Sequence, residues 1–235
     1  MIIKHSFHSS KKFARWTGLF YLLIITSGLT SGLVVRDALV DMADPHGTLQ
    51  RIIQQETLYR IGFLCDTLMV ISDVMVSVLF YYLLRSVHQL IALLAAVFRL
   101  MQSAILGANL INLFNPILMI QGHEILQGDQ LQLLEQAVMT QLQIFEYGYL
   151  ISGVFFAVNC AWMGYLLFHS QLFPKTLGVM IGLASIGYLS NCLAHFIAPN
   201  WIESSEMVML LTAVIAELTL CLYLLIVGVR RLNPA

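Results

Sequence analysis

Four ionisable side chains lie inside long apolar stretches of this 235-residue chain, and a fifth lies at the start of such a stretch. They are Asp66, Asp73, Arg99 and Glu217, with Glu146 at the edge. An ionisable group at the centre of a bilayer costs about 2.5–3.5 kcal/mol on insertion scales, so each should be paired, hydrated or functional. Carboxylates in such places can act as general acids, or can bind a polar molecule together with a guanidinium.

Spacing along the expected helices places three of these groups at one depth. Asp73, Arg99 and Glu217 lie about 16–18 Å from the same side of the membrane, at 1.5 Å per helical residue. A tight turn at residues 85–87 should make the second and third helices antiparallel neighbours, so we predict an Asp73–Arg99 ion pair. Asp66 precedes Asp73 by two helical turns and should share its face.

A second set of polar residues is expected toward the outer side of the membrane. Its members are Asp66, Asn109, Asn112, Glu146, Tyr147, Tyr188, Asn191 and His195. Together the two sets describe a polar column in which carboxylates outnumber cations. The structural alternative is that buried Asn, Gln and Tyr join helices by hydrogen bonds, while the ion pair fixes their register.

For the cluster as a whole we favour a functional cavity over that alternative. The predicted ligand-binding residues are Asp66, Asp73, Arg99, Gln102, Asn109, Glu146, Asn191, His195 and Glu217.

The sequence contains no residue pattern for a metal or a cofactor. His195 has no histidine partner at i+3 or i+4, as zinc or haem would need. No phosphate loop, nucleophile elbow or HExxH motif occurs. Cys65, Cys160, Cys192 and Cys221 have no paired spacing. We therefore expect no metal site, no cofactor, and free thiols that pack as small apolar groups.

Composition sets the class of protein. Hydrophobic residues make up 59% of the chain and charged residues 11%, against about 25% charged in soluble domains. This excludes a disordered chain, a disulfide-rich scaffold and a collagen-like fibre. The net charge of −1 gives no reason to expect nucleic acid as a partner. We expect a multi-pass membrane protein in contact with membrane lipids.

Six apolar stretches are long enough to cross about 30 Å of hydrocarbon as helices. They cover residues 16–35, 60–84, 88–115, 144–168, 174–197 and 207–229, with Pro116 closing the third. This predicts an all-α bundle of six transmembrane helices, forming a single transmembrane domain over residues 1–235. Gly28 with Gly32, and Gly178 with Gly182, form small-xxx-small faces that should pack against other helices.

The distribution of Lys and Arg predicts the orientation. Eight of the twelve fall on one side of the six-span arrangement, in the N-terminal segment, the turns at Arg85 and Lys175, and the tail. Arg36, Arg51 and Arg60 fall in the first loop on the other side. The positive-inside rule therefore places both termini in the cytoplasm, with the protein in the cell (inner or plasma) membrane. The first stretch is read as a retained span because no Ala-x-Ala site follows it.

Two loops on the outer side carry amphipathic helical patterns. The first follows Asp44 and Pro45, which suit a helix start, and the second follows Asp129. The apolar positions are Leu49, Ile52, Ile53 and Tyr59 in the first loop, and Leu131, Leu134, Val138 and Leu142 in the second. We predict two short interfacial helices before spans two and four, with loop helices packed on the bundle as the alternative.

Several short motifs occur along the chain in a fixed order. They are ARWTGLFYL at 14–22, FRLMQ at 98–102, LGANL at 106–110, YGY at 147–149, GVFF at 153–156, GYL at 164–166, FPKTLG at 173–178 and GYL at 187–189. Together they resemble the mainly bacterial membrane family called domain of unknown function 4386. The resemblance implies a small multi-pass membrane protein and no particular reaction. It also implies histidines in the fourth span where this chain has Glu146 and Asn159, which argues against a histidine-based site.

Three roles are compatible with these residues. The first is a protein that binds or moves a small polar or amphipathic ligand in the polar cavity, with or without a coupled proton. The second is an intramembrane enzyme that uses Asp66, Asp73 or Glu217 as a general acid on a lipid or isoprenoid. The third is an assembly protein whose polar groups only specify packing. We prefer the first.

Overall fold

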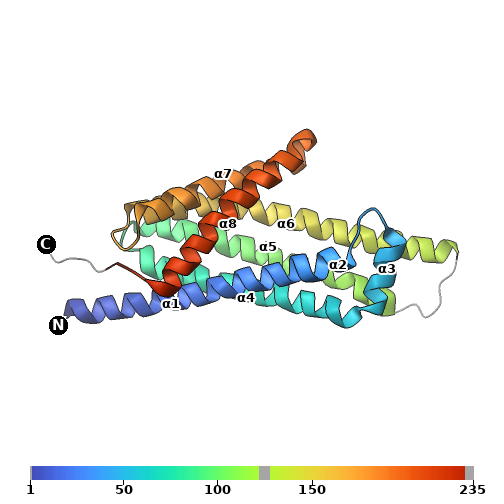
Figure 1. The fold of residues 1–235 in the computed structure, drawn as a ribbon, viewed down its shortest axis with the longest axis horizontal. Helices are drawn as coiled ribbons and strands as arrows, with labels where there is room; N and C mark the ends of the chain where they lie inside the picture. Colours follow the sequence, from blue (N-terminus) through green and yellow to red (C-terminus); the bar gives the residue numbers. More distant parts are fainter. Residues whose placement is uncertain (1, 122–127, 231–235) are drawn as a thin grey trace. The chain divides into compact units, whose positions relative to one another are not determined.

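The computed structural model describes residues 2–121 and 128–230, and this part of the chain is helical (Figure 1). Six segments of it are long and apolar enough to cross a membrane: Ser10–Leu39, Glu56–Leu84, Gln89–Gln121, Asp129–His169, Lys175–Ile197 and Pro199–Ile226. The all-α, six-span architecture is therefore confirmed. Lys4 and Arg231, two of the eight basic residues on the predicted inner side, lie outside the residues whose side chains are described, as does His123.

The helices follow one another with short connections. Helix α1 (Ile2–Leu29) continues through a π-helix (Thr30–Arg36) into α2 (Asp37–Leu39). The following helices are α3 (Pro45–Gln54), α4 (Glu56–Leu84), α5 (Gln89–Gln121), α6 (Asp129–His169) and α7 (Lys175–Ile197), and a 3₁₀ turn (Pro199–Trp201) leads into α8 (Ile202–Ile226). The predicted ends of the second span at Leu84 and of the fifth at Ile197 are confirmed.

The chain forms two compact units, each built from segments distant in sequence. Unit 1 comprises Met1–Leu22, Ser72–Ser103 and Leu150–Ala235, and unit 2 comprises Leu23–Ile71 and Ala104–Tyr149. Each unit has its own hydrophobic contacts and its own buried polar cluster.

In unit 1 a tight turn joins α4 to α5. The turn covers residues 85–87, and the His88 ring nitrogen accepts the Ile91 N–H at the start of α5. The Ser77 hydroxyl donates to the Ala96 carbonyl across the two helices at 2.9 Å. The second and third spans are therefore antiparallel neighbours in this unit, as the sequence predicts.

Close helix contacts in unit 1 depend on glycine. Helices α7 and α8 lie side by side (orange and red in Figure 1). A Cβ added to Gly178 of α7 would lie 2.7 Å from the Gly164 carbonyl oxygen and 2.5 Å from the Phe168 nitrogen, both in α6. A Cβ added to Gly182 would meet no atom within 4 Å. The predicted packing role of this small-residue face is therefore confirmed, and Gly178 makes the tighter approach.

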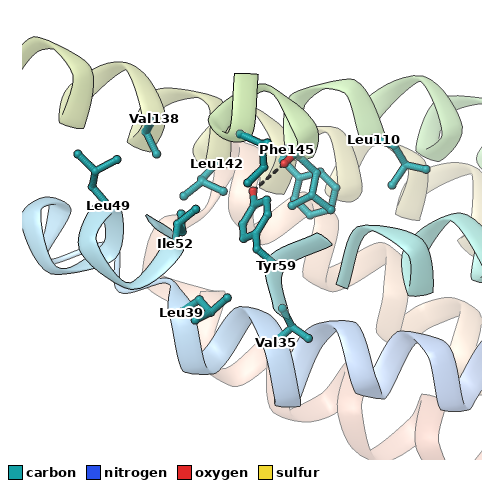
Figure 2. Packing of buried hydrophobic residues seen from close by; sticks show 11 residues of the cluster. Val35, Leu39, Leu49, Ile52, Tyr59, Leu110, Val138, Leu142 and Phe145 are labelled. Atoms are coloured by element: carbon teal, nitrogen blue, oxygen red, sulfur yellow. Dashed lines mark hydrogen bonds between the residues drawn. The ribbon is translucent and has the colours of Figure 1, made fainter. Parts of the chain in front are cut away.

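A hydrophobic cluster forms the core of unit 2 (Figure 2). It gathers side chains from the end of the first span, α3, α4, α5 and α6. Its buried members are Val35, Leu39, Leu49, Ile52, Tyr59, Leu110, Leu113, Ile117, Val138, Leu142 and Phe145. In the same unit, Gly28 faces α4, where an added Cβ would lie 3.2 Å from the Met69 sulfur. Residues far apart in sequence therefore share one apolar core in this unit.

The first predicted loop helix, α3, packs on this cluster. Asp44 caps it by accepting the Gly47 N–H at 2.9 Å, with a proline at the first helical position. Leu49 and Ile52 are fully buried, whereas Ile53 is 44% exposed and does not belong to the predicted face. Protein covers the apolar side of α3, which agrees with a loop helix packed on the bundle.

The second predicted loop helix is the N-terminal part of α6. The helix begins at Asp129 as predicted, where a carboxylate interacts favourably with the helix dipole. Val138 and Leu142 are buried in the cluster, and Leu131 and Leu134 pack partly against it. The segment is not separate, because α6 continues without a break into the fourth span.

Helix α5 runs through Pro116 to Gln121, so the prediction that this proline closes the third span is wrong. A proline cannot donate to the carbonyl four residues before it, here Asn112, and its ring crowds that carbonyl. The Tyr59 hydroxyl donates to the carbonyl of the next residue, Leu113, at 2.6 Å (dashed in Figure 2). A side chain of α4 thus supplies a donor where the helical hydrogen bonding is weakened, as neighbours do for prolines in membrane spans.

Candidate functional site

The carboxylate of Asp66 is the centre of a buried polar cluster in unit 2. Asp66 is 1% exposed, and its Oδ2 accepts hydrogen bonds from the Ser31 hydroxyl at 2.6 Å and from Arg36 Nη1 at 2.5 Å. The Arg36 guanidinium also lies over the Phe145 ring, 5.3 Å from its centroid. The charge of Asp66 is therefore matched by a cation and by a hydroxyl donor, as a carboxylate removed from water requires.

The π-helix explains why Arg36 reaches Asp66. In an α-helix, residues five apart point about 140° away from each other. In a π-helix, hydrogen bonds join residues five apart, and here the Asp37 N–H donates to the Gly32 carbonyl. Ser31 and Arg36 therefore lie one turn apart on the same side. The assignment of Arg36 to the first outer loop is wrong, because this widened turn directs its guanidinium back to α4.

A hollow of about 410 Å³ adjoins this ion pair in unit 2. It is lined by Gly32, Arg36, Asp37, Val40 and Met42 from the last turns of the first span and the loop after α2, and by Leu142, Phe145, Glu146 and Tyr149 of α6. Its volume lies within the range of about 300–1,000 Å³ typical of small-molecule sites. The lining combines apolar and aromatic side chains with a few charged ones, which is the composition of such sites.

The predicted Asp73–Arg99 ion pair is present in unit 1. Arg99 Nη2 lies 2.5 Å from Asp73 Oδ1, and the Ser103 hydroxyl donates to Asp73 Oδ2 at 2.6 Å. Arg99 also lies near the Tyr21 and Phe156 rings, 5.4 and 5.2 Å from their centroids. Both charged side chains are 4% exposed. A closed pair of this kind supports the structural reading for these two residues.

Glu217 has tyrosine partners in the same unit. The Tyr188 hydroxyl of α7 donates to Glu217 Oε1 of α8, and Tyr21 provides another side-chain hydrogen bond. Glu217 also interacts electrostatically with Arg99 and with Asp73. The three residues that the sequence places at one depth are therefore near enough to interact within unit 1.

Two predicted polar residues of unit 2 join helices. The Asn109 side-chain amide donates to the Phe145 carbonyl at 2.8 Å and accepts from the Asn112 amide at 2.9 Å. Asn109 therefore links α5 to α6, as the structural alternative describes. Glu146 is exposed and lines the hollow.

Three further predicted residues lie in unit 1. The Ser205 hydroxyl donates to the Asn191 side-chain oxygen at 3.3 Å, and His195 Nδ1 lies 3.0 Å from the Asn191 carbonyl. The other ring nitrogen of His195 is 3.4 Å from Glu206. Gln102 is half-buried. The members of the predicted polar column thus belong to both units, and the column as a whole stays a prediction.

Comparison with known proteins identifies the family of the chain. The family described as Domain of unknown function (DUF4386) matches residues 16–228. The chain belongs to this family. The resemblance carried by the sequence motifs is therefore confirmed.

A relative of the chain comes from an archaeon. A protein of Archaeoglobus fulgidus described as an uncharacterized protein is 30% identical over 129 residues, which are 55% of this DUF4386 chain and 64% of that protein. No solved structure matches the chain. The function of this DUF4386 protein is therefore inferred from its own residues.

Sequence reasoning missed two residues of the unit 2 cluster, Ser31 and Arg36. The available signal was a lone arginine at the end of an apolar stretch, together with a buried Asp66 that had no assigned cation. With Arg36 included, each of the two buried aspartates has its own guanidinium. The four cysteines are free thiols, as predicted.

Proposed function

We propose that this membrane protein binds a small polar or amphipathic ligand in the hollow of unit 2. The observation that carries the proposal is the volume of about 410 Å³ beside the Arg36–Asp66 ion pair. Phe145 and Tyr149 would contact the apolar part of such a ligand, and the charged side chains of the lining its polar part.

The alternative of an intramembrane enzyme receives less support. Its candidate acids are Asp66, Asp73 and Glu217. Asp66 and Asp73 are buried and paired with guanidinium groups, and neither of them lines the hollow. Glu217 accepts from tyrosine. These partners support the binding role for unit 2 and a structural role for the ion pair in unit 1.

The hollow can be filled from Gly32, where an added Cβ makes no steric clash. Gly32 lies in its lining, and an added Cβ would meet only Arg36 Nη2, at 3.8 Å. We expect a molecule that co-purifies with the wild-type protein, detected by mass spectrometry, to be lost from Gly32→Trp. Leu33→Trp is the matched control, since Leu33 is 63% exposed and does not line the hollow. Identical co-purified molecules in both variants would contradict the proposal.

We also propose that both termini face the cytoplasm and that residues 1–235 act as one transmembrane domain. The excess of Lys and Arg on one side of the six spans supports this orientation. An impermeant maleimide added to intact cells should label Ala43→Cys and spare Lys12→Cys, both of which are exposed positions. The reverse labelling pattern would reject the orientation.

A further inference from the structure

The charges around the hollow of unit 2 indicate which ligands it would accept. Arg36 carries the positive charge of the lining, and it is bonded to Asp66 at 2.5 Å. That pair is neutral as a unit. Asp37 and Glu146 are exposed and also line the hollow. When Asp66 is counted with the lining, its carboxylates outnumber the one guanidinium, so the net charge around the hollow is negative.

The apolar part of the lining suits a cationic ligand that also carries an apolar body. Phe145 and Tyr149 present aromatic rings, and Val40, Met42 and Leu142 present aliphatic surface. Aromatic faces attract organic cations. The Arg36 guanidinium already lies over the Phe145 ring, so the carboxylates rather than this ring would hold an ammonium group. Carboxylates beside aromatic rings and aliphatic surface are complementary to an ammonium group joined to an apolar body.

We infer that the hollow binds an organic ammonium attached to an apolar body, either a free amine or the head group of an aminolipid. This inference rests on the proposed binding function and specifies its ligand class. The neutral Arg36–Asp66 pair forms one wall, the carboxylates of Asp37 and Glu146 hold the ammonium, and the aromatic residues hold the apolar body.

The test compares two probes of similar shape and opposite charge. The full chain in dodecyl maltoside micelles is titrated with phenethylammonium and with 3-phenylpropionate by calorimetry. We expect phenethylammonium to bind and 3-phenylpropionate not to bind. Glu146→Gln and Asp37→Asn should each weaken the cation by about three- to fivefold, the effect of one partly exposed charge. Glu203→Gln is the matched control, because Glu203 is exposed and belongs to unit 1.

The outcomes separate the ligand class from the binding function. Binding of 3-phenylpropionate in preference to the amine would overturn the ammonium class and leave the binding function standing. Failure of both probes, or equal amine binding by Glu146→Gln, Asp37→Asn and wild type, would also overturn it. The co-purification experiment decides the binding function independently. If the natural ligand is a lipid head group, added phosphatidylethanolamine should displace the amine. Phosphatidylglycerol, which carries no amine, is the matched control and should not displace it.

An independent observation in unit 1 carries a second inference. A cavity of about 10 Å³ is lined by Arg99 and Asn159, among others. Arg99 Nε and Asn159 Oδ1 are buried and have no hydrogen-bond partner in the described part of the chain. The Asn159 amide nitrogen donates to the Ala95 carbonyl at 2.8 Å, which fixes Oδ1 as the remaining acceptor.

We propose that one water molecule binds between Arg99 and Asn159. It would accept from Arg99 Nε–H and donate to Asn159 Oδ1. About 10–15 Å³ of accessible space is enough for one water. An experimental structure near 2 Å resolution should show density about 3 Å from both atoms, retained in Asn159→Asp and lost in Asn159→Leu. Absence of this density in the wild-type protein, or a protein acceptor bonded to Arg99 Nε, would overturn the proposal.

Discussion

Arg36 lies five residues after Ser31, and its guanidinium donates to the Ser31 hydroxyl at 2.7 Å. Both groups bond the same oxygen of Asp66. This contact depends on the π-helix, because regular α-helical geometry would turn the two side chains away from each other. Short π-helical segments are frequent at functional sites, and this one also borders the hollow.

Removal of Arg36 should destabilise the protein more than removal of the whole pair. Arg36→Gln leaves the carboxylate of Asp66 buried without a cation, which costs about 3 kcal/mol in comparable cases. The double variant Arg36→Gln, Asp66→Asn should recover most of this loss. The measurement is the free energy of unfolding by sodium dodecyl sulfate titration in mixed micelles. A double variant no more stable than Arg36→Gln would contradict the pairing.

The ion pair of unit 1 should not tolerate reversal. In the double variant Asp73→Arg, Arg99→Asp, a carboxylate would replace the guanidinium near the rings of Tyr21 and Phe156, and Ser103 would face a cation. We expect lower thermal stability than in the neutral double variant Asp73→Asn, Arg99→Gln. Full recovery of the wild-type melting temperature in the reversed protein would show that only the charge pair matters.

The Tyr59 hydroxyl should contribute to the stability of α5 near Pro116. Tyr59→Phe removes the donor to the Leu113 carbonyl and should cost about 1 kcal/mol, the net value of one hydrogen bond. Tyr82→Phe is a suitable control, since it removes a hydroxyl from a 42% exposed ring. Equal unfolding free energies for the two variants would argue against the role of Tyr59.

Two glycines on one face of α7 should respond differently to alanine. Gly178→Ala forces backbone atoms of α6 and α7 apart and should lower the unfolding free energy by about 2 kcal/mol. Gly182→Ala meets open space and gains helix propensity, so it should be neutral or stabilising. Thermal melting of the two purified variants tests the difference. A melting temperature of Gly178→Ala equal to that of Gly182→Ala would show that the α6–α7 contact is not tight.

The ion pair of unit 1 was predictable because Asp73 and Arg99 lie on helices joined by a short turn. A short turn fixes how the two helices align. Counting residues from the turn therefore places Asp73 and Arg99 at the same depth. Asp129 and Asp44 were likewise predictable as helix starts, because the chemistry of helix ends is local. The six spans were also predictable, because hydropathy is a property of each local stretch of sequence.

Other features depend on contacts that no local pattern contains. The Arg36–Asp66 pair requires a π-helix, and the residue types in that segment do not indicate one. The hydroxyl that donates to the α5 backbone near Pro116 belongs to Tyr59 of another helix. The hollow arises from two segments about one hundred residues apart in sequence, so only the folded chain reveals it.

Helix α6 has 41 residues and is therefore about 61 Å long, roughly twice the thickness of the hydrocarbon core. Its N-terminal part carries Val138 and Leu142, which pack in the cluster with Leu49 of α3. Packing outside the hydrocarbon is driven by removal of apolar surface from water, a driving force that is absent between helices in lipid. Urea weakens packing that is driven by removal of apolar surface from water. The extramembrane part of unit 2 should consequently melt in urea like a water-soluble domain, while helices within the bilayer stay folded.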